Sequence, residues 1–119
     1  MTSAVRTDPD CIFCKIVAGL IPARRVHEDD QVIAFHDIHP SAPVHLLLVP
    51  KLHLVSMVDV QPEHQDLLGH MMVLSARLMR DLGVTGGYRH VINTGRDGGQ
   101  EVQHLHLHVM GGPRPWAKG

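Results

Sequence analysis

Three histidines near the C-terminal end of the chain, His104, His106 and His108, alternate with apolar residues. Successive side chains of a β-strand point to opposite faces of a sheet, so an extended segment would place the three imidazoles on one face, roughly 6.5–7 Å apart. Imidazole is nucleophilic, basic and able to carry a proton near neutral pH. The pattern therefore favours a catalytic face over a site that only binds metal, and over histidines that lie on the surface by chance.

A face of this kind is suited to phosphoryl transfer. The central histidine could attack phosphorus and form a covalent phosphohistidine-type intermediate, while a neighbouring histidine stabilises phosphate oxygens or protonates the leaving group. Gly98 and Gly99, in the preceding loop, permit a close approach of backbone amides to an anionic ligand. The sequence has neither the lysine of a Walker-type phosphate loop nor an Asp/Glu cluster typical of a magnesium site.

The two cysteines, Cys11 and Cys14, are three positions apart. A disulfide between them would close a very small loop and would constrain the unfolded chain little. The pair therefore indicates metal or redox chemistry, with small buried side chains as the alternative.

Length and charge restrict the class of protein. With 119 residues the chain suits one domain, and 11 Lys+Arg against 12 Asp+Glu give a net charge of -1. This balance provides no basic surface for a nucleic-acid backbone, so no nucleic-acid partner is expected. Apolar runs such as 46–49 are far shorter than the roughly 20 residues that span a bilayer, and residues 1–10 lack the apolar core of a secretory signal. We therefore expect a cytoplasmic protein without a membrane partner.

Hydrophobic periodicity and turn residues predict an α+β domain. Short connections between neighbouring strands favour a five-stranded, mainly antiparallel sheet with one long and one short helix packed on it. Residues 1–10 are expected to form a frayed tail, and residues 11–119 a single domain. The expected elements are a short helix over 11–17 capped by Asp10, strands over 25–27, 31–36 and 44–49, a long helix over 62–82, and strands over 88–93 and 102–110.

The segment 104–110 resembles the defining motif of the histidine triad (HIT) superfamily, in which three histidines alternate with apolar residues. Further segments are similar to the nucleotide-binding Hint branch, in the same order and over nearly the whole of 11–116: they are 34–38, 42–45, 49–53, 67–70 and 95–100. The resemblance implies a HIT-like fold and a homodimer. It also implies a purine-nucleotide-binding hydrolase that cleaves the P–N bond of nucleoside 5′-phosphoramidates, those of adenosine above all, with aminoacyl-adenylates as further substrates.

The resemblance also assigns roles by position. His106 would be the nucleophile, and His108 would hold phosphate oxygens and assist the leaving amine. His104 would orient His106 through its backbone and pair with His45. Glu101 replaces a serine found in many relatives, and we expect it to turn outward or to bind the leaving amine. The implied nucleotide site comprises Phe35, His36, Asp37, Ile38, Asn93, Gly99, Gln100, Glu101, His106 and His108.

Metal binding and catalysis are separate questions for this sequence. Some histidine triad relatives bind zinc at positions that correspond here to Cys11, Cys14, His53 and His104, a donor set that structural zinc prefers. Many others lack the cysteines, so the resemblance implies no cofactor for catalysis and leaves structural zinc and simple packing as alternatives. A nucleotide sensor or scaffold with little physiological catalysis is the alternative function.

Overall fold

The computed structural model describes residues 8–116, which form two α-helices, two short 3₁₀ turns and five strands. Their bounds in chain order are α1 (Ile12–Val17), β1 (Arg25–Glu28), β2 (Val32–His36), β3 (Val44–Pro50), η1 (Met57–Asp59), η2 (Pro62–His64), α2 (Gln65–Asp81), β4 (Tyr88–Val91) and β5 (Leu107–Gly111). No helix among these residues combines the length and the apolar composition needed to cross a membrane. Most of the tail predicted over 1–10, and the end of the domain at 117–119, lie outside the described residues.

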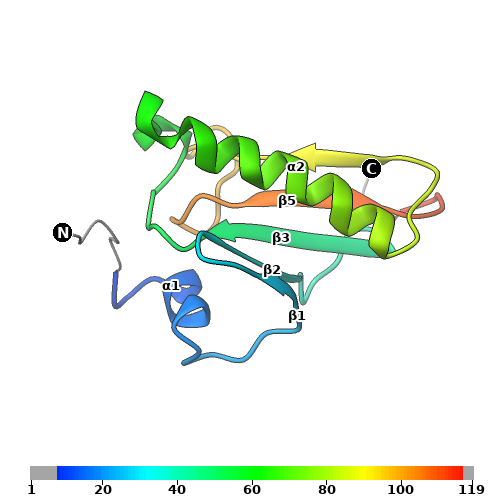
Figure 1. Ribbon diagram of the computed structural model, residues 1–119, viewed down its shortest axis with the longest axis horizontal. Helices are drawn as coiled ribbons and strands as arrows, with labels where there is room; N and C mark the ends of the chain where they lie inside the picture. Colours follow the sequence, from blue (N-terminus) through cyan, green and yellow to red (C-terminus); the bar gives the residue numbers. More distant parts are fainter. Residues whose placement is uncertain (1–7, 117–119) are drawn as a thin grey trace.

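The five strands form one open sheet in the order β1-β2-β3-β5-β4, and every neighbouring pair is antiparallel. The chain leaves β3, passes through α2, adds β4 at the edge and returns with β5 between β3 and β4 (Figure 1). In this register Leu48 of β3 lies opposite Leu107 of β5, and Ala34 of β2 lies opposite Leu48. The predicted α+β architecture is confirmed.

Both faces of the sheet are buried in its central strands, and each face packs against a different helix. Leu46 and Leu48 of β3 belong to the hydrophobic cluster that α2 covers. Leu47 and Val49 point the other way, into a second cluster with α1. Figure 1 shows α2 across one face of the sheet and α1 on the other side. Because nearly every position of β3 is buried, the sequence shows a continuous apolar run over 46–49 in place of polar–apolar alternation.

The short helix α1 begins differently from the prediction. Cys11, not Asp10, is the N-terminal cap, and its Sγ accepts a hydrogen bond from the backbone N–H of Cys14 at 3.2 Å. The backbone N–H of Asp10 instead bonds to Oδ1 of Asp8, within the turn before the helix. Both cysteines are buried and free. The cap therefore uses a side chain that also belongs to the candidate metal site.

The last predicted strand is shorter than expected. Regular pairing begins only at Leu107; residues 102–104 form bends, and 105–106 have no regular secondary structure. This segment is held instead by other contacts, including a hydrogen bond from the N–H of Leu105 to the carbonyl of Leu54 at 2.7 Å. Of the three alternating histidines, only His108 lies within the ladder. The other two need partners outside the sheet.

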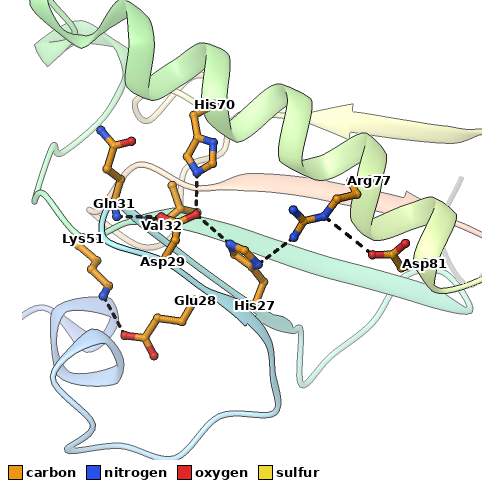
Figure 2. Close-up of polar contacts among 9 residues, drawn as sticks. All are labelled: His27, Glu28, Asp29, Gln31, Val32, Lys51, His70, Arg77 and Asp81. Atoms are coloured by element: carbon orange, nitrogen blue, oxygen red, sulfur yellow. Dashed lines mark hydrogen bonds and ion pairs between the residues drawn. The ribbon is translucent and has the colours of Figure 1, made fainter.

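Asp29, in the turn between β1 and β2, connects this hairpin to α2 (Figure 2). Its Oδ1 accepts hydrogen bonds from the backbone N–H groups of Gln31 and Val32, at 2.8 and 2.9 Å. Its Oδ2 accepts hydrogen bonds from His27 at 2.8 Å and His70 at 2.6 Å. Partial burial acts to raise the pKa of Asp29, but these four donors together hold it well below its usual value. The carboxylate thus stays charged and fixes the hairpin under the helix.

Candidate active site

The alternating segment sorts its side chains onto two faces, as the sequence pattern predicts. Leu105, Leu107 and Val109 enter the cluster under α2. The imidazoles of His106 and His108 lie on the α1 side, with ring centroids 4.9 Å apart, closer than the spacing of an ideal strand. The apolar residues therefore anchor the segment and hold the imidazoles on the opposite side before any ligand arrives.

Phe13 of α1 packs against the imidazole rings of His104 and His106. Its ring meets His106 edge to face, with centroids 5.1 Å apart, and His104 in a similar way at 6.0 Å. Phe13 is itself buried in the second cluster. Sequence reasoning did not assign it to the site, although its position between the two cysteines on a short amphipathic helix was a usable signal.

The hydrogen-bond partner of His106 determines which ring nitrogen carries the proton. Nδ1 of His106 lies 2.7 Å from the backbone carbonyl oxygen of His104. A carbonyl oxygen only accepts, so Nδ1 carries the proton and donates, and Nε2 keeps its lone pair. The backbone carbonyl of His104 thus fixes the orientation of the His106 ring. A neutral imidazole with a free Nε2 lone pair is a nucleophile.

A second chain of hydrogen bonds fixes His45 and His108. The backbone N–H of Ser41 donates to Nδ1 of His45 at 2.9 Å, so the proton of neutral His45 is on Nε2. That N–H donates to Nδ1 of His108, also at 2.9 Å. His108 therefore carries its own proton on Nε2. The chain of donors runs in one direction, from the backbone of Ser41 to Nε2 of His108.

The expected partnership of His45 with His104 is wrong: His45 pairs with His108. The register between β3 and β5 is the reason, because it places His45 opposite Met110, two residues from His108 on the same face. His104 lies before β5 and its ring turns toward the cysteines. The resemblance identified His45 as part of the site but not its contact.

The electrostatics of the site keep these imidazoles neutral in the absence of an anion. Burial lowers the pKa of His108 to about 4, with a further contribution from the neighbouring His106 and His45. Burial also lowers the pKa of His45, although the carboxylate of Asp37 opposes this shift. Oδ2 of Asp37 lies 3.4 Å from Nε2 of His45. An anionic ligand at His108 would favour its charged form and raise its pKa.

A cavity of about 310 Å³ opens between α1, the end of β2 and the histidines. Most residues of the implied nucleotide site line it, and apolar side chains contribute the rest of its wall. Its volume is at the lower end of the range typical of small-molecule sites. The residues of the implied site that line it are Phe35, His36, Asp37, Ile38, Asn93, Glu101, His106 and His108.

Gly99 and Gln100 are not brought to this cavity. Their amides bond within their own turn, to the carbonyls of Arg96 and Gly95 at 3.1 and 3.0 Å. The buried Gln100 side chain donates to the carbonyl of Val55 at 2.6 Å and accepts from the N–H of Gly95 at 2.9 Å. Gln100 therefore fixes the loop, whereas the sequence suggested direct contact with phosphate.

The four residues of the predicted metal site lie together, all of their ligand atoms within 4.8 Å of one another. Nδ1 of His104 is 3.2 Å from Sγ of Cys11 and 3.1 Å from Nδ1 of His53, which is 3.2 Å from Sγ of Cys14. The edges of a tetrahedron around zinc with sulfur and nitrogen ligands are about 3.3–3.8 Å long. The donor set and its spacing therefore fit a tetrahedral metal ion.

His104 presents the correct nitrogen to this cluster. Its Nε2 donates to the carbonyl of Pro50 at 2.8 Å, so the lone pair of Nδ1 points toward the cysteines. Burial raises the pKa of Cys14 to about 11, so a cation is needed to hold it as a thiolate near neutral pH. Asp37, His45 and His108 also lie within 4.8 Å of one another, but there Nε2 of His45 carries a proton. That second group therefore acts as a hydrogen-bond chain.

The fold and the arrangement of its histidines are those of a histidine triad protein. A family model described as "Scavenger mRNA decapping enzyme C-term binding" matches residues 10–117. Protein HitA of Neisseria gonorrhoeae is 53% identical over 87% of this chain and 97% of its own length. The purine nucleoside phosphoramidase of Escherichia coli is 43% identical over 87% of each chain. The chain belongs to the histidine triad (HIT) family.

Solved structures agree with this assignment. A histidine triad protein from Clostridium difficile superposes with a TM-score of 0.88 at 43% identity, over 92% of this chain and 96% of that one. A HIT family hydrolase from Legionella pneumophila superposes with a TM-score of 0.86 at 44% identity, over 88% of this chain and 95% of that one. A zinc-bound histidine triad protein from Mycobacterium smegmatis superposes with a TM-score of 0.76 at 36% identity, over 86% of this chain and 74% of that one.

Proposed function

We propose that this protein hydrolyses the P–N bond of purine nucleoside 5′-phosphoramidates through a covalent nucleotidyl intermediate on His106. The observation that carries the proposal is the free Nε2 lone pair of His106, which the carbonyl of His104 holds beside the cavity. The similarity to a purine nucleoside phosphoramidase supports the same substrate class. Aminoacyl-adenylates present the same nucleotidyl phosphorus and are further candidates.

In the first step, Nε2 of His106 attacks the phosphorus. An N–P bond forms, the bond from phosphorus to the amine breaks, and its electron pair stays on the leaving nitrogen. With the anionic substrate bound, the His45–His108 pair takes up one proton from the solvent, and Nε2 of His108 gives a proton to the leaving nitrogen, which returns the pair to its neutral form. Because an unprotonated amide ion is a very poor leaving group, this proton makes the step possible. The products are a free amine and a nucleotidyl-His106.

In the second step, water attacks the same phosphorus. The P–Nε2 bond breaks, its electron pair returns to His106, and the water gives one proton to the solvent as the nucleoside monophosphate forms. The hydrogen bond from Nδ1 of His106 to His104 disperses the positive charge on the phosphorylated imidazole. Asp37, near the N–H of His45, stabilises positive charge on His45 and His108 in the same way.

The cavity provides a place for the nucleoside. Phe35 and Ile38 supply apolar surface for a purine, and Ile38 is 84% exposed in the absence of a ligand. Asp37 lies at the same wall, and ribose hydroxyls can donate to its carboxylate. Oδ1 of Asp37 already accepts from the N–H of His39 at 2.9 Å, which fixes the direction of the side chain.

We propose structural zinc at Cys11, Cys14, His53 and His104. The distances among the donor atoms support it, and so does the similarity to a zinc-bound relative. The ion would cross-link α1 to the segment before β5, and it takes no part in the reaction. His104 would then serve twice, with its side chain on the metal and its carbonyl on the nucleophile.

We also propose a homodimer formed along β4. This strand is at one edge of the sheet, and its outer backbone groups have no strand partner among residues 8–116 (Figure 1). His90 of β4 bonds to Ser75 of α2 at 2.8 Å, so one side of α2 lies beside this edge. On the same helix, Met72 is 43% and Val73 is 73% exposed. A Val73→Asp variant should shift the sedimentation of the protein from dimer toward monomer.

The test of the function compares wild-type protein with His106→Ala and a control, His64→Gln, on a fluorogenic adenosine phosphoramidate. His64 lies in η2 and does not line the cavity. Wild type and the control should release the amine, and His106→Ala should not, while binding of AMP by calorimetry persists. Unchanged turnover in His106→Ala would reject the mechanism. AMP binding with negligible turnover by wild type on every phosphoramidate tested would instead favour the sensor.

A further inference from the structure

The cavity that we assign to an anionic substrate has an unexpected set of charges. None of the described residues that line it is a lysine or an arginine. Its lining includes two carboxylates, Asp37 and Glu101, and four histidines: His36, His39, His106 and His108. A phosphate in this cavity would thus be held without a lysine or arginine from the described lining, and beside two carboxylates.

The two carboxylates differ in their surroundings. Asp37 accepts the N–H of His39 and lies 3.4 Å from the N–H of His45, so it has a defined role within the protein. Glu101 is exposed, and among residues 8–116 no hydrogen bond or ion pair satisfies its carboxylate. It follows the loop that Gln100 fixes and precedes the histidines. Glu101 is therefore a carboxylate of the cavity lining that has no protein partner among residues 8–116.

A carboxylate beside an anion site disfavours the phosphate but can favour the whole substrate. Unit charges about 6 Å apart in a solvent-exposed cavity alter an equilibrium by about three- to tenfold. Whether the carboxylate weakens or strengthens substrate binding depends on the charge of the substrate group that lies beside it. If the leaving amine bears its own positive charge, the repulsion between Glu101 and the phosphate is offset by an attraction, and specificity results from both.

We propose that Glu101 is a specificity-determining residue that binds positive charge on the leaving group. The preferred substrates are then nucleoside phosphoramidates whose amine carries a second, protonated amino group, such as diamines or basic amino acids. Neutral alkylamines would be disfavoured. This inference rests on the proposed phosphoramidase function, and it adds to that function the chemical class of the leaving amine.

The test uses a matched pair of adenosine 5′-phosphoramidates, one of trimethylenediamine and one of butylamine. The two amines have the same chain length and differ in a terminal ammonium or methyl group. Wild-type protein should show a kcat/KM about three- to tenfold higher for the diamine compound at low ionic strength. This preference should decrease in about 0.5 M salt, because exposed charges are screened.

Glu101→Gln keeps the shape of the side chain and removes its charge. In this variant the two values of kcat/KM should become equal, mainly because the butylamine compound is hydrolysed faster once the repulsion is gone. Asp97→Asn is the matched control, since Asp97 is an exposed carboxylate of the same loop that does not line the cavity. It should keep the wild-type preference.

The outcomes separate this inference from the proposed function. If wild-type protein hydrolyses both compounds equally well, or if Glu101→Gln keeps the preference, the role of Glu101 is refuted and the phosphoramidase function stands. If the preference disappears equally in Asp97→Asn, the effect belongs to the general field of the loop and the inference is also refuted. If wild-type protein hydrolyses neither compound, the proposed function fails and this inference fails with it.

Discussion

Replacement of Asp29 by asparagine should weaken the connection between the β1–β2 turn and α2 (Figure 2). The retained Oδ1 can still accept the two backbone amides, but an NH₂ group would replace Oδ2 and face the N–H groups of His27 and His70. His27 cannot change tautomer without cost, because its Nδ1 accepts from Arg77 at 3.1 Å. Within the described part of the chain, Asp29 is the one hydrogen-bond partner of His70, so His70 can turn an unprotonated nitrogen to the amide.

The expected loss follows from this difference. A hydrogen bond to a charged partner contributes about 1.5–3 kcal/mol, and the side chain of Asp29 is 29% exposed, which favours the lower end. With the contact to His27 lost and that to His70 weakened, Asp29→Asn should reduce the free energy of unfolding by about 2 kcal/mol. For a domain of this size, the melting temperature should fall by about 6–12 °C.

The assay is urea unfolding followed by circular dichroism, near neutral pH and again in acid. The control is Asp81→Asn, which breaks an ion pair with Arg77 whose side chains are 61% and 52% exposed. Such a pair contributes about 0–1 kcal/mol, so the control should change little. Because the pKa of Asp29 is lower in the folded protein than in the unfolded chain, its contribution is present above about pH 4 and is lost as the pH falls further. Equal stability of the two variants near neutral pH would refute the role of Asp29.

Three further predictions concern the site and its loop. Burial keeps the pKa of His108 at about 4 and lowers that of His45, while unfolded histidine titrates at about 6.5. The unfolded chain therefore binds protons first, and urea titrations at stepped pH should show stability falling between about pH 6.5 and 4; a constant stability there would contradict the burial of these groups. Protein purified without a histidine tag should contain about one zinc ion per subunit, and Cys14→Ser should abolish binding and lower the melting temperature; zinc well below one per subunit in the wild type would exclude the site. Gly98→Ala should cost about 1–3 kcal/mol in thermal or urea unfolding, because a Cβ there would press against the backbone carbonyl of Thr94; a stability equal to wild type would show that the loop relaxes freely.

The pattern of side chains predicted the two faces of the last strand, because burial decides which residues of an alternating segment enter the core. Leu107 lies under α2 and His106 lies on the other side, as alternation requires. The apolar run likewise predicted a strand over 44–49, and β3 spans Val44–Pro50. These features depend on local periodicity, which a sequence displays directly.

Contacts between distant segments were harder to predict. The partner of His45 depends on the register of β3 against β5, and an offset of a few residues decides between His108 and His104. The N-terminal cap was assigned to Asp10 because aspartate is the commoner capping residue. Cys11 takes this role because its Sγ must also face the buried cluster with His104. The tautomers of the histidines could not be predicted either. They depend on hydrogen bonds to backbone carbonyl and N–H groups, and the residue types do not show these partners.

The burial of both sheet faces has a consequence for quality control of this protein. If β5 paired one position out of register, Leu107 and Val109 would exchange faces with His108. The imidazole of His108 would then lie in the hydrophobic cluster below α2, and apolar side chains would take its place beside the cavity. The same shift in register would therefore reduce both stability and activity. Mispaired molecules should unfold or be degraded, and the fraction of chains that survives as folded protein should be close to the fraction that carries a complete site.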